Sequence, residues 1–200
     1  MNWEEFKKVC QKTWHFIWYD DSLASWIINI ILVFVLIKFI VYPLLGLMLG
    51  TSFPVVAVIS GSMEHNGDAE AWWESSSPWY LEHSIGKEEF MEYPFTRGFN
   101  KGDIMILAGV SPEDVKRGDV LVFQTTARKE PIIHRVVIIE KQDGNYVFQT
   151  KGDNVPVQHS FETSIASTQV IGKAVFRIPF LGYIKLGFVS LLRLLHVPGV

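Results

Sequence analysis

Cysteine is nearly absent from this 200-residue chain, because Cys10 is the only one. The segment after residue 50 therefore has no disulfide, no thiolate metal site and no cysteine nucleophile, which leaves serine as the natural candidate for a nucleophile. Charge is also scarce. Only 20% of the residues are charged, the net charge is −3 and no stripe is rich in arginine, so nucleic acid is not expected as a partner. This composition is too apolar for an ordinary cytosolic protein and suggests one modest domain with a membrane anchor.

A long apolar run covers residues 26–50. Its length is enough to cross a hydrocarbon core of ~30 Å as a tilted helix, and Asp21 or Ser22 can cap its start. The run is too long, too far from the N-terminus and too poor in nearby cleavage sites for a removable signal peptide. Lys38 and Pro43 are costly in lipid, so we expect them to face a protein partner or to be eased by snorkelling and local backbone adjustment. Lys38 is equally consistent with a tolerated charge that has no role.

Basic residues predict the orientation of this helix. Lys7, Lys8 and Lys12 precede it, whereas no lysine or arginine occurs from residue 51 to 86. The N-terminus is therefore expected in the cytoplasm and residues 51–178 outside. Residues 1–25 form either an amphipathic segment on the inner leaflet or a simple solvated helix. The residues that would share its apolar face are Trp3, Phe6, Cys10, Trp14 and Ile17.

The outer domain, residues 51–178, is predicted to be mostly β. A short β-branched run over 55–59 ends at a Ser-Gly-Ser sequence, and further apolar runs follow at wide spacing. The additional strand candidates are 104–107, 120–124, 131–140, 146–150 and 170–178. A hairpin turn is expected at residues 143–145 and one short helical turn at residues 111–114, where proline follows a capping serine.

Two segments stand apart from this β pattern. Residues 65–98 are rich in aromatics without a strand period and are expected to form an inserted loop, which dips toward lipid, walls a substrate groove, or packs on the domain through its own rings. Its His65 and His83 lack a metal-ligand spacing, so no metal is expected. Residues 179–200 are apolar but carry Lys185, which favours an interfacial segment over a second membrane helix.

Three short motifs supply the groups of a serine hydrolase. Ser62 lies in Ser-Gly-Ser-Met, His134 in Ile-His-Arg-Val and Asp153 in Lys-Gly-Asp-Asn. A serine becomes a good nucleophile when a base takes its proton, and an acid then orients the base. Together the motifs resemble the type I signal peptidase family over residues 55–63 and 101–182. His134 stands where bacterial members carry lysine, which is typical of the archaeal and endoplasmic-reticulum branch.

The resemblance implies a role for each residue. Ser62 attacks the scissile carbonyl, His134 is the base, and Ser60 donates to the oxyanion while Gly61 permits a close backbone approach. Relatives carry a second aspartate six residues after the first and use it as the acid, but here that position is His159. Asp153 is therefore the predicted acid. The alternatives are that Asp153 braces the loop beside the serine, that Glu162 has taken over, or that the enzyme works as a dyad.

The function implied is a membrane-anchored serine endopeptidase that removes signal peptides from secreted preproteins, with no metal or organic cofactor. Small side chains are expected at the first and third positions before the cut. The expected partners are preproteins, the lipid bilayer, and partner subunits or the translocation channel. An archaeal plasma membrane fits the lack of outer cysteines better than the endoplasmic reticulum does. Two rivals are an inactive membrane-tethered β-domain subunit of a secretion complex and a self-cleaving relative of LexA-type repressors.

Overall fold

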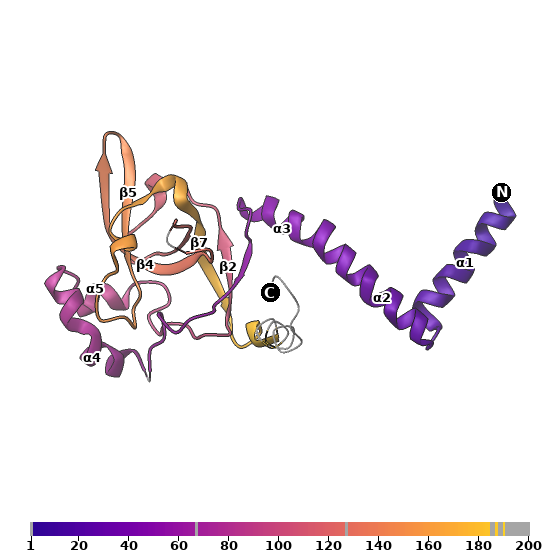
Figure 1. The fold of residues 1–200 in the computed structure, drawn as a ribbon, viewed down its shortest axis with the longest axis horizontal. Helices are drawn as coiled ribbons and strands as arrows, with labels where there is room; N and C mark the ends of the chain where they lie inside the picture. The colour runs from indigo at the N-terminus through magenta and orange to yellow at the C-terminus, as the bar shows by residue number, and fades with distance from the viewer. Residues whose placement is uncertain (1, 67, 127, 185–186, 188–189, 191–200) are drawn as a thin grey trace. The chain divides into compact units, whose positions relative to one another are not determined.

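The computed structural model describes residues 2–66, 68–126, 128–184, 187 and 190, and it divides into two compact units, Met1–Met48 and Leu49–Val200 (Figure 1). The first unit is helical and the second contains the sheet. The predicted interfacial or membrane-spanning character of residues 179–200 falls largely outside the described residues.

The first unit holds α1 (Trp3–Tyr19) and then a continuous helix made of α2 (Leu23–Leu36), a π-helical turn (Ile37–Val41) and α3 (Tyr42–Leu49). Of the two predicted caps, Ser22 is the one used, since its side chain accepts a hydrogen bond from the backbone N–H of Ser25. The continuous helix, Leu23–Leu49, has 27 residues and is long and apolar enough to cross a membrane. It begins three residues before the predicted run, 26–50.

The π-helical turn ends at Val41, two residues before Pro43. Because proline has no N–H, a regular α-helix would leave a carbonyl one turn earlier without its partner. The Tyr42 N–H instead bonds the carbonyl of Ile37, five residues back, which is the kind of local backbone adjustment expected here. The ammonium of Lys38 lies over the rings of Phe34 and Phe39, 5.7 and 5.5 Å from their centres.

The second unit is built on a curled, seven-stranded antiparallel sheet, which confirms the mostly β prediction. The strands follow the order β1-β2-β7-β3-β4-β5-β6 across the sheet. Their bounds are β1 (Val55–Ala57), β2 (Ile104–Ala108), β3 (Val120–Phe123), β4 (Ile132–Gln142), β5 (Asn145–Lys151), β6 (Ile165–Ala166) and β7 (Val170–Ile178). Each predicted strand is present, whereas β6 was missed because two residues carry no periodicity.

Two apolar clusters cover the two faces of the central strand β3. Val120 and Val122 pack into one cluster, and Leu121 and Phe123 pack into the other. Successive side chains of a strand point to opposite faces, so a strand buried on both faces must be apolar at every position. The predicted turns are also found, since Asp143 and Gly144 take positive φ angles of 50° and 84° at the β4–β5 hairpin, and a short 3₁₀ turn covers Pro112–Asp114.

Residues 65–98 are not an irregular loop, and that prediction was wrong. They contain α4 (Ala69–Glu82), capped by the Asp68 side chain, and α5 (Lys87–Met91), which Figure 1 shows beside β4. The aromatics of α4 recur at i, i+1, i+7 and i+8, which is a helical spacing, but a polar turn and Pro78 interrupt it. These rings pack inward against β4, so the segment is held on the domain by its own aromatics. The buried members are Trp72, Trp73, Tyr80, Ile85, Phe90 and Val137.

Candidate active site

The Ser60–Glu64 turn follows the first strand of the sheet. The pairing of β1 is extended by Val58, whose N–H and carbonyl bond the backbone of Asp103 and Gly102. The chain then reverses, and the Glu64 N–H bonds the Gly61 carbonyl at 3.1 Å. A Cβ atom on Gly61 would lie 2.8 Å from the Glu64 side-chain carboxylate, so glycine leaves room for that side chain in the turn. The turn leaves the Ser62 side chain half-buried at the end of the strand.

Ser62 and His134 are brought together from opposite parts of the chain. His134 lies on β4, opposite Leu121 of β3, and is 5% exposed. Its Nε2 is 2.9 Å from the Ser62 Oγ. When the Ser62 hydroxyl donates to Nε2, the other ring nitrogen, Nδ1, carries the proton. This is the arrangement in which a histidine can accept the hydroxyl proton during nucleophilic attack.

Glu162 accepts a hydrogen bond from the protonated ring nitrogen of His134. It lies in the 3₁₀ turn Ser160–Glu162, and its Oε1 accepts a short hydrogen bond from His134 Nδ1 and a long one, 3.4 Å, from the Thr150 hydroxyl. Its Oε2 accepts from the backbone N–H of His159 at 2.9 Å. Burial alone would raise the pKa of Glu162, but the hydrogen bond and charge interaction with His134 and the His159 N–H outweigh it and lower that pKa. Glu162 is therefore ionised at neutral pH.

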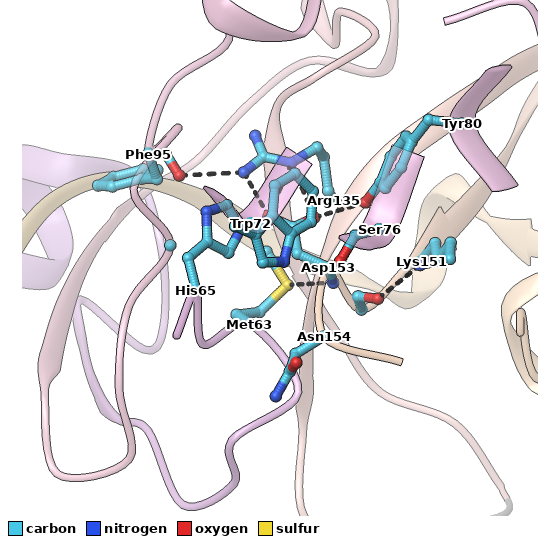
Figure 2. A network of polar contacts seen from close by, with 12 residues as sticks. Met63, His65, Trp72, Ser76, Tyr80, Phe95, Arg135, Lys151, Asp153 and Asn154 are labelled. Carbon is cyan, nitrogen blue, oxygen red and sulfur yellow. Dashed lines mark hydrogen bonds and ion pairs between the residues drawn. The ribbon is translucent and has the colours of Figure 1, made fainter. Parts of the chain in front are cut away.

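Asp153 does not contact His134, which corrects the predicted geometry. Its Oδ1 accepts from the Tyr80 hydroxyl at 2.8 Å, its Oδ2 accepts from Arg135 Nη2 at 2.7 Å, and His65 Nε2 lies 2.9 Å from Oδ2 (Figure 2). Because side chains alternate along β4, Arg135 points to the face opposite His134. The Asp153 carboxylate, which is bonded to Arg135, therefore lies on that opposite face. Burial opposes ionisation of Asp153, but Arg135 and His65 outweigh it and hold its pKa below the ordinary value.

The loop around Asp153 nevertheless contacts the reacting groups through its backbone. The Asn154 N–H bonds the Ser62 carbonyl at 2.8 Å, and the Asn154 amide donates to the Gly61 carbonyl at 3.0 Å. A Cβ atom on Gly152 would lie 2.9 Å from His134 Nε2. This geometry matches the alternative in which Asp153 braces the loop beside the serine.

His159 occupies the position where the acid was expected from the resemblance. Its ring stacks on Phe161, with 5.0 Å between centres, and its backbone supports Glu162. The sequence motifs offer Glu162 only as one alternative, and they do not identify His65, Tyr80 and Arg135 as the residues that hold Asp153. Arg135 directly follows His134 in the sequence, so strand alternation could have placed it behind the site.

A cleft of about 340 Å³ opens in front of Ser62 and His134. One side is formed by Ala57 and Ile59, and the other by residues 131–134 at the start of β4. Within the described residues, β1 pairs only with β2, and β5 pairs with β4 only from Arg135 onward. Both sides of the cleft therefore present strand edges. The rest of the lining is Ser60, Arg128, Glu130, Val155, His159 and Phe161.

Comparison with known proteins gives the relationship of this chain. It is 26% identical over 143 residues to the human "Signal peptidase complex catalytic subunit SEC11C", which covers 68% of this chain and 58% of that protein. It is 25% identical over 154 residues to the SEC11 catalytic subunit of Scheffersomyces stipitis, covering 74% and 73%. It is 34% identical over 94 residues to human "Putative signal peptidase complex catalytic subunit SEC11B", covering 42% and 54%. No family model matches the chain.

The chain is a distant homologue of signal peptidase catalytic subunits. This relationship confirms the resemblance to the type I signal peptidases of the archaeal and endoplasmic-reticulum branch that the serine and histidine motifs indicated. The chain spans 58% of the length of the mammalian SEC11C relative.

Proposed function

We propose that this chain is a membrane-anchored serine endopeptidase that removes N-terminal signal peptides from secreted preproteins. The observation that carries the proposal is the 2.9 Å contact between Ser62 Oγ and His134 Nε2, backed by the ionised Glu162 and opening on a cleft. The homology to signal peptidase catalytic subunits supports the substrate class.

The chemistry follows from these positions. His134 Nε2 takes the proton of Ser62 as Oγ attacks the scissile carbonyl, and the resulting imidazolium donates from Nδ1 to Glu162. His134 then returns the proton to the leaving amine, and water hydrolyses the acyl-enzyme by the same route. The Ser60 hydroxyl lies 3.2 Å from Ser62 Oγ, so it is placed beside the carbonyl under attack and is our candidate donor to the oxyanion, with the Ser62 N–H.

The cleft suggests how a peptide binds. An extended chain placed between β1 and the start of β4 gains backbone hydrogen bonds from two strand edges. Side chains at the first and third positions before the cut then point the same way, toward the apolar residues Ala57, Ile59 and Ile133, and small residues are our proposed preference there.

The membrane arrangement is part of the proposal. The apolar helix Leu23–Leu49 anchors the chain, with the N-terminal segment 1–25 in the cytoplasm and the catalytic domain, residues 51–178, outside. The anchor ends at Leu49, 13 residues before Ser62 in the sequence, and so tethers the site to the membrane from which a signal peptide emerges. The relatives' names describe subunits of a complex, which supports partner subunits for this chain also. An archaeal cell membrane is our proposed location.

The direct test is processing of a signal-peptide-bearing preprotein by the full chain in lipid vesicles. Wild type should release a mature protein whose N-terminus is sequenced, and Ser62→Ala and His134→Ala should not. Ser52→Ala, which changes an exposed serine outside the cleft, is the matched control and should cleave normally. If Ser62→Ala cleaves as fast as wild type, the nucleophile is wrong. If wild type never cleaves, the chain is instead an inactive subunit of a secretion complex.

A further inference from the structure

The inserted segment 65–98 reaches the back of the candidate active site. Two of its side chains, His65 and Tyr80, meet the Asp153 carboxylate, and Arg135 of β4 supplies the third contact (Figure 2). All four side chains are fully buried. A buried carboxylate is stable only when its charge is neutralised and its oxygens are hydrogen-bonded. Here Arg135 neutralises the charge of Asp153, and His65, Tyr80 and Arg135 all donate hydrogen bonds to it.

The segment also fixes the two donors in place. The His65 ring stacks on Trp72 of α4 with 3.8 Å between centres and 5° between planes. Tyr80 packs edge-on against both Trp72 and Phe90, at 5.8 and 5.1 Å. Burial and the Asp153 charge hold the pKa of Tyr80 well above its ordinary value, so its hydroxyl keeps its proton and remains a donor.

Asp153 sits in the middle of the loop that touches both reacting groups. Its own N–H points to the Met63 sulfur at 3.3 Å, the next residue bonds the Ser62 carbonyl, and the preceding Gly152 packs against His134. A shift of the Asp153 side chain therefore moves Ser62 and His134 relative to each other. Misplacement of reacting groups by about 1 Å lowers rates by roughly 10²-fold.

We propose that the 65–98 segment is a positioning element of the peptidase, in which His65 and Tyr80 hold Asp153 and, through the Gly152–Asn154 loop, set the distance between Ser62 and His134. This inference rests on the proposed function. Neither His65 nor Tyr80 lines the cleft, so both act on the rate of the chemical step and not on substrate binding.

The test is Tyr80→Phe, which removes the hydroxyl and keeps the ring. We expect kcat to fall about tenfold with KM unchanged, because the loop loses one of its anchors but the cleft is intact. Tyr93→Phe is the matched control, since it lies in the same segment and its hydroxyl donates to Glu89 instead. It should keep wild-type kcat. Thermal unfolding of each variant shows whether it is folded at the assay temperature.

His65 gives an independent measurement. His65→Gln places an amide N–H near the position of Nε2 and should retain most of kcat, whereas His65→Leu should lose about as much as Tyr80→Phe. If folded Tyr80→Phe and His65→Leu match Tyr93→Phe in kcat, or change only KM, the positioning role is wrong while Ser62-dependent cleavage stands. If wild type shows no Ser62-dependent cleavage, the proposed function fails and this inference fails with it.

Discussion

Replacing Glu162 by glutamine tests the acid of the site with little change in shape. Glu162 accepts hydrogen bonds at both oxygens, from His134 Nδ1 at one and from the His159 N–H at the other. An amide has one acceptor and one donor end, so either orientation of glutamine sets a donor against a donor or forces His134 into the other tautomer. In that tautomer Nε2 carries the proton and cannot accept one from Ser62.

The expected loss can be sized from these contacts. The variant loses the charge that stabilises the imidazolium and, in one orientation, the tautomer that activates Ser62. We therefore expect kcat to fall about 10²- to 10⁴-fold, which corresponds to about 3–5 kcal/mol in the barrier. KM should change little, since Glu162 does not line the cleft. The lowered pKa of Glu162 means that its ionisation stabilises the fold above about pH 4.5, and this contribution is lost as the pH falls through the lowered pKa.

The assay is steady-state cleavage of a synthetic signal-peptide substrate by the full chain in detergent, with Glu113→Gln as a control at an exposed carboxylate. Asp153→Asn is the informative comparison. It removes the partner of the buried Arg135 and should lower the unfolding temperature, whereas Glu162→Gln should act mainly on kcat. A folded Glu162→Gln with wild-type kcat would refute the assignment of Glu162 as the acid.

Three further predictions concern residues around the loop. Burial lowers the pKa of Lys151 from 10.5 to about 8. Between these pH values the unfolded chain binds more protons than the folded chain, so the free energy of unfolding should rise with pH by up to about 3 kcal/mol. Lys151→Met should abolish this rise when unfolding is measured in urea. Gly152→Ala would place a Cβ atom 2.9 Å from His134 Nε2 and 3.0 Å from the Ser62 carbonyl, and should lower kcat about 10²-fold in the peptide assay. Ser60→Ala should lower kcat about 10²-fold at constant KM, because one oxyanion donor is lost.

Each of these has a clear opposite result. A Lys151→Met variant whose stability still rises between pH 8 and 10.5 would mean that another group titrates there. Normal kcat in Gly152→Ala would mean that the loop accommodates the added methyl group without displacing His134 or Ser62. A Ser60→Ala variant that changes KM alone would place Ser60 in substrate binding.

The strands could be predicted because burial determines where apolar residues lie along each strand. The VLVF run of β3 is apolar at every position, and the turn at Asp143 and Gly144 has residues that tolerate positive φ. The helix α4 could not be predicted from the sequence, because three serines and Pro78 interrupt its aromatic face. Its stability comes instead from packing on β4.

The site was predictable only where the chemistry needs a particular residue type. Ser62 and His134 were identified by their motifs and are in contact. The carboxylate that contacts His134 Nδ1 could not be predicted in the same way, because any carboxylate within reach of Nδ1 can make this contact, and reach depends on the backbone. Glu162 has a longer side chain than aspartate and lies three residues beyond the expected position, on a 3₁₀ turn that no sequence pattern placed beside β4.

Trapping of the acyl-enzyme tests directly whether Ser62 is the nucleophile. The full chain in detergent is incubated with a peptide that carries an activated ester at the cleavage position. The chain is then digested with trypsin, and the masses of its peptides are measured by mass spectrometry. We expect the acyl group on Ser62 in wild type, none in Ser62→Ala, and far slower acylation in His134→Ala. Acylation of another residue at the wild-type rate, or none under conditions where the chain cleaves a preprotein, would contradict this assignment.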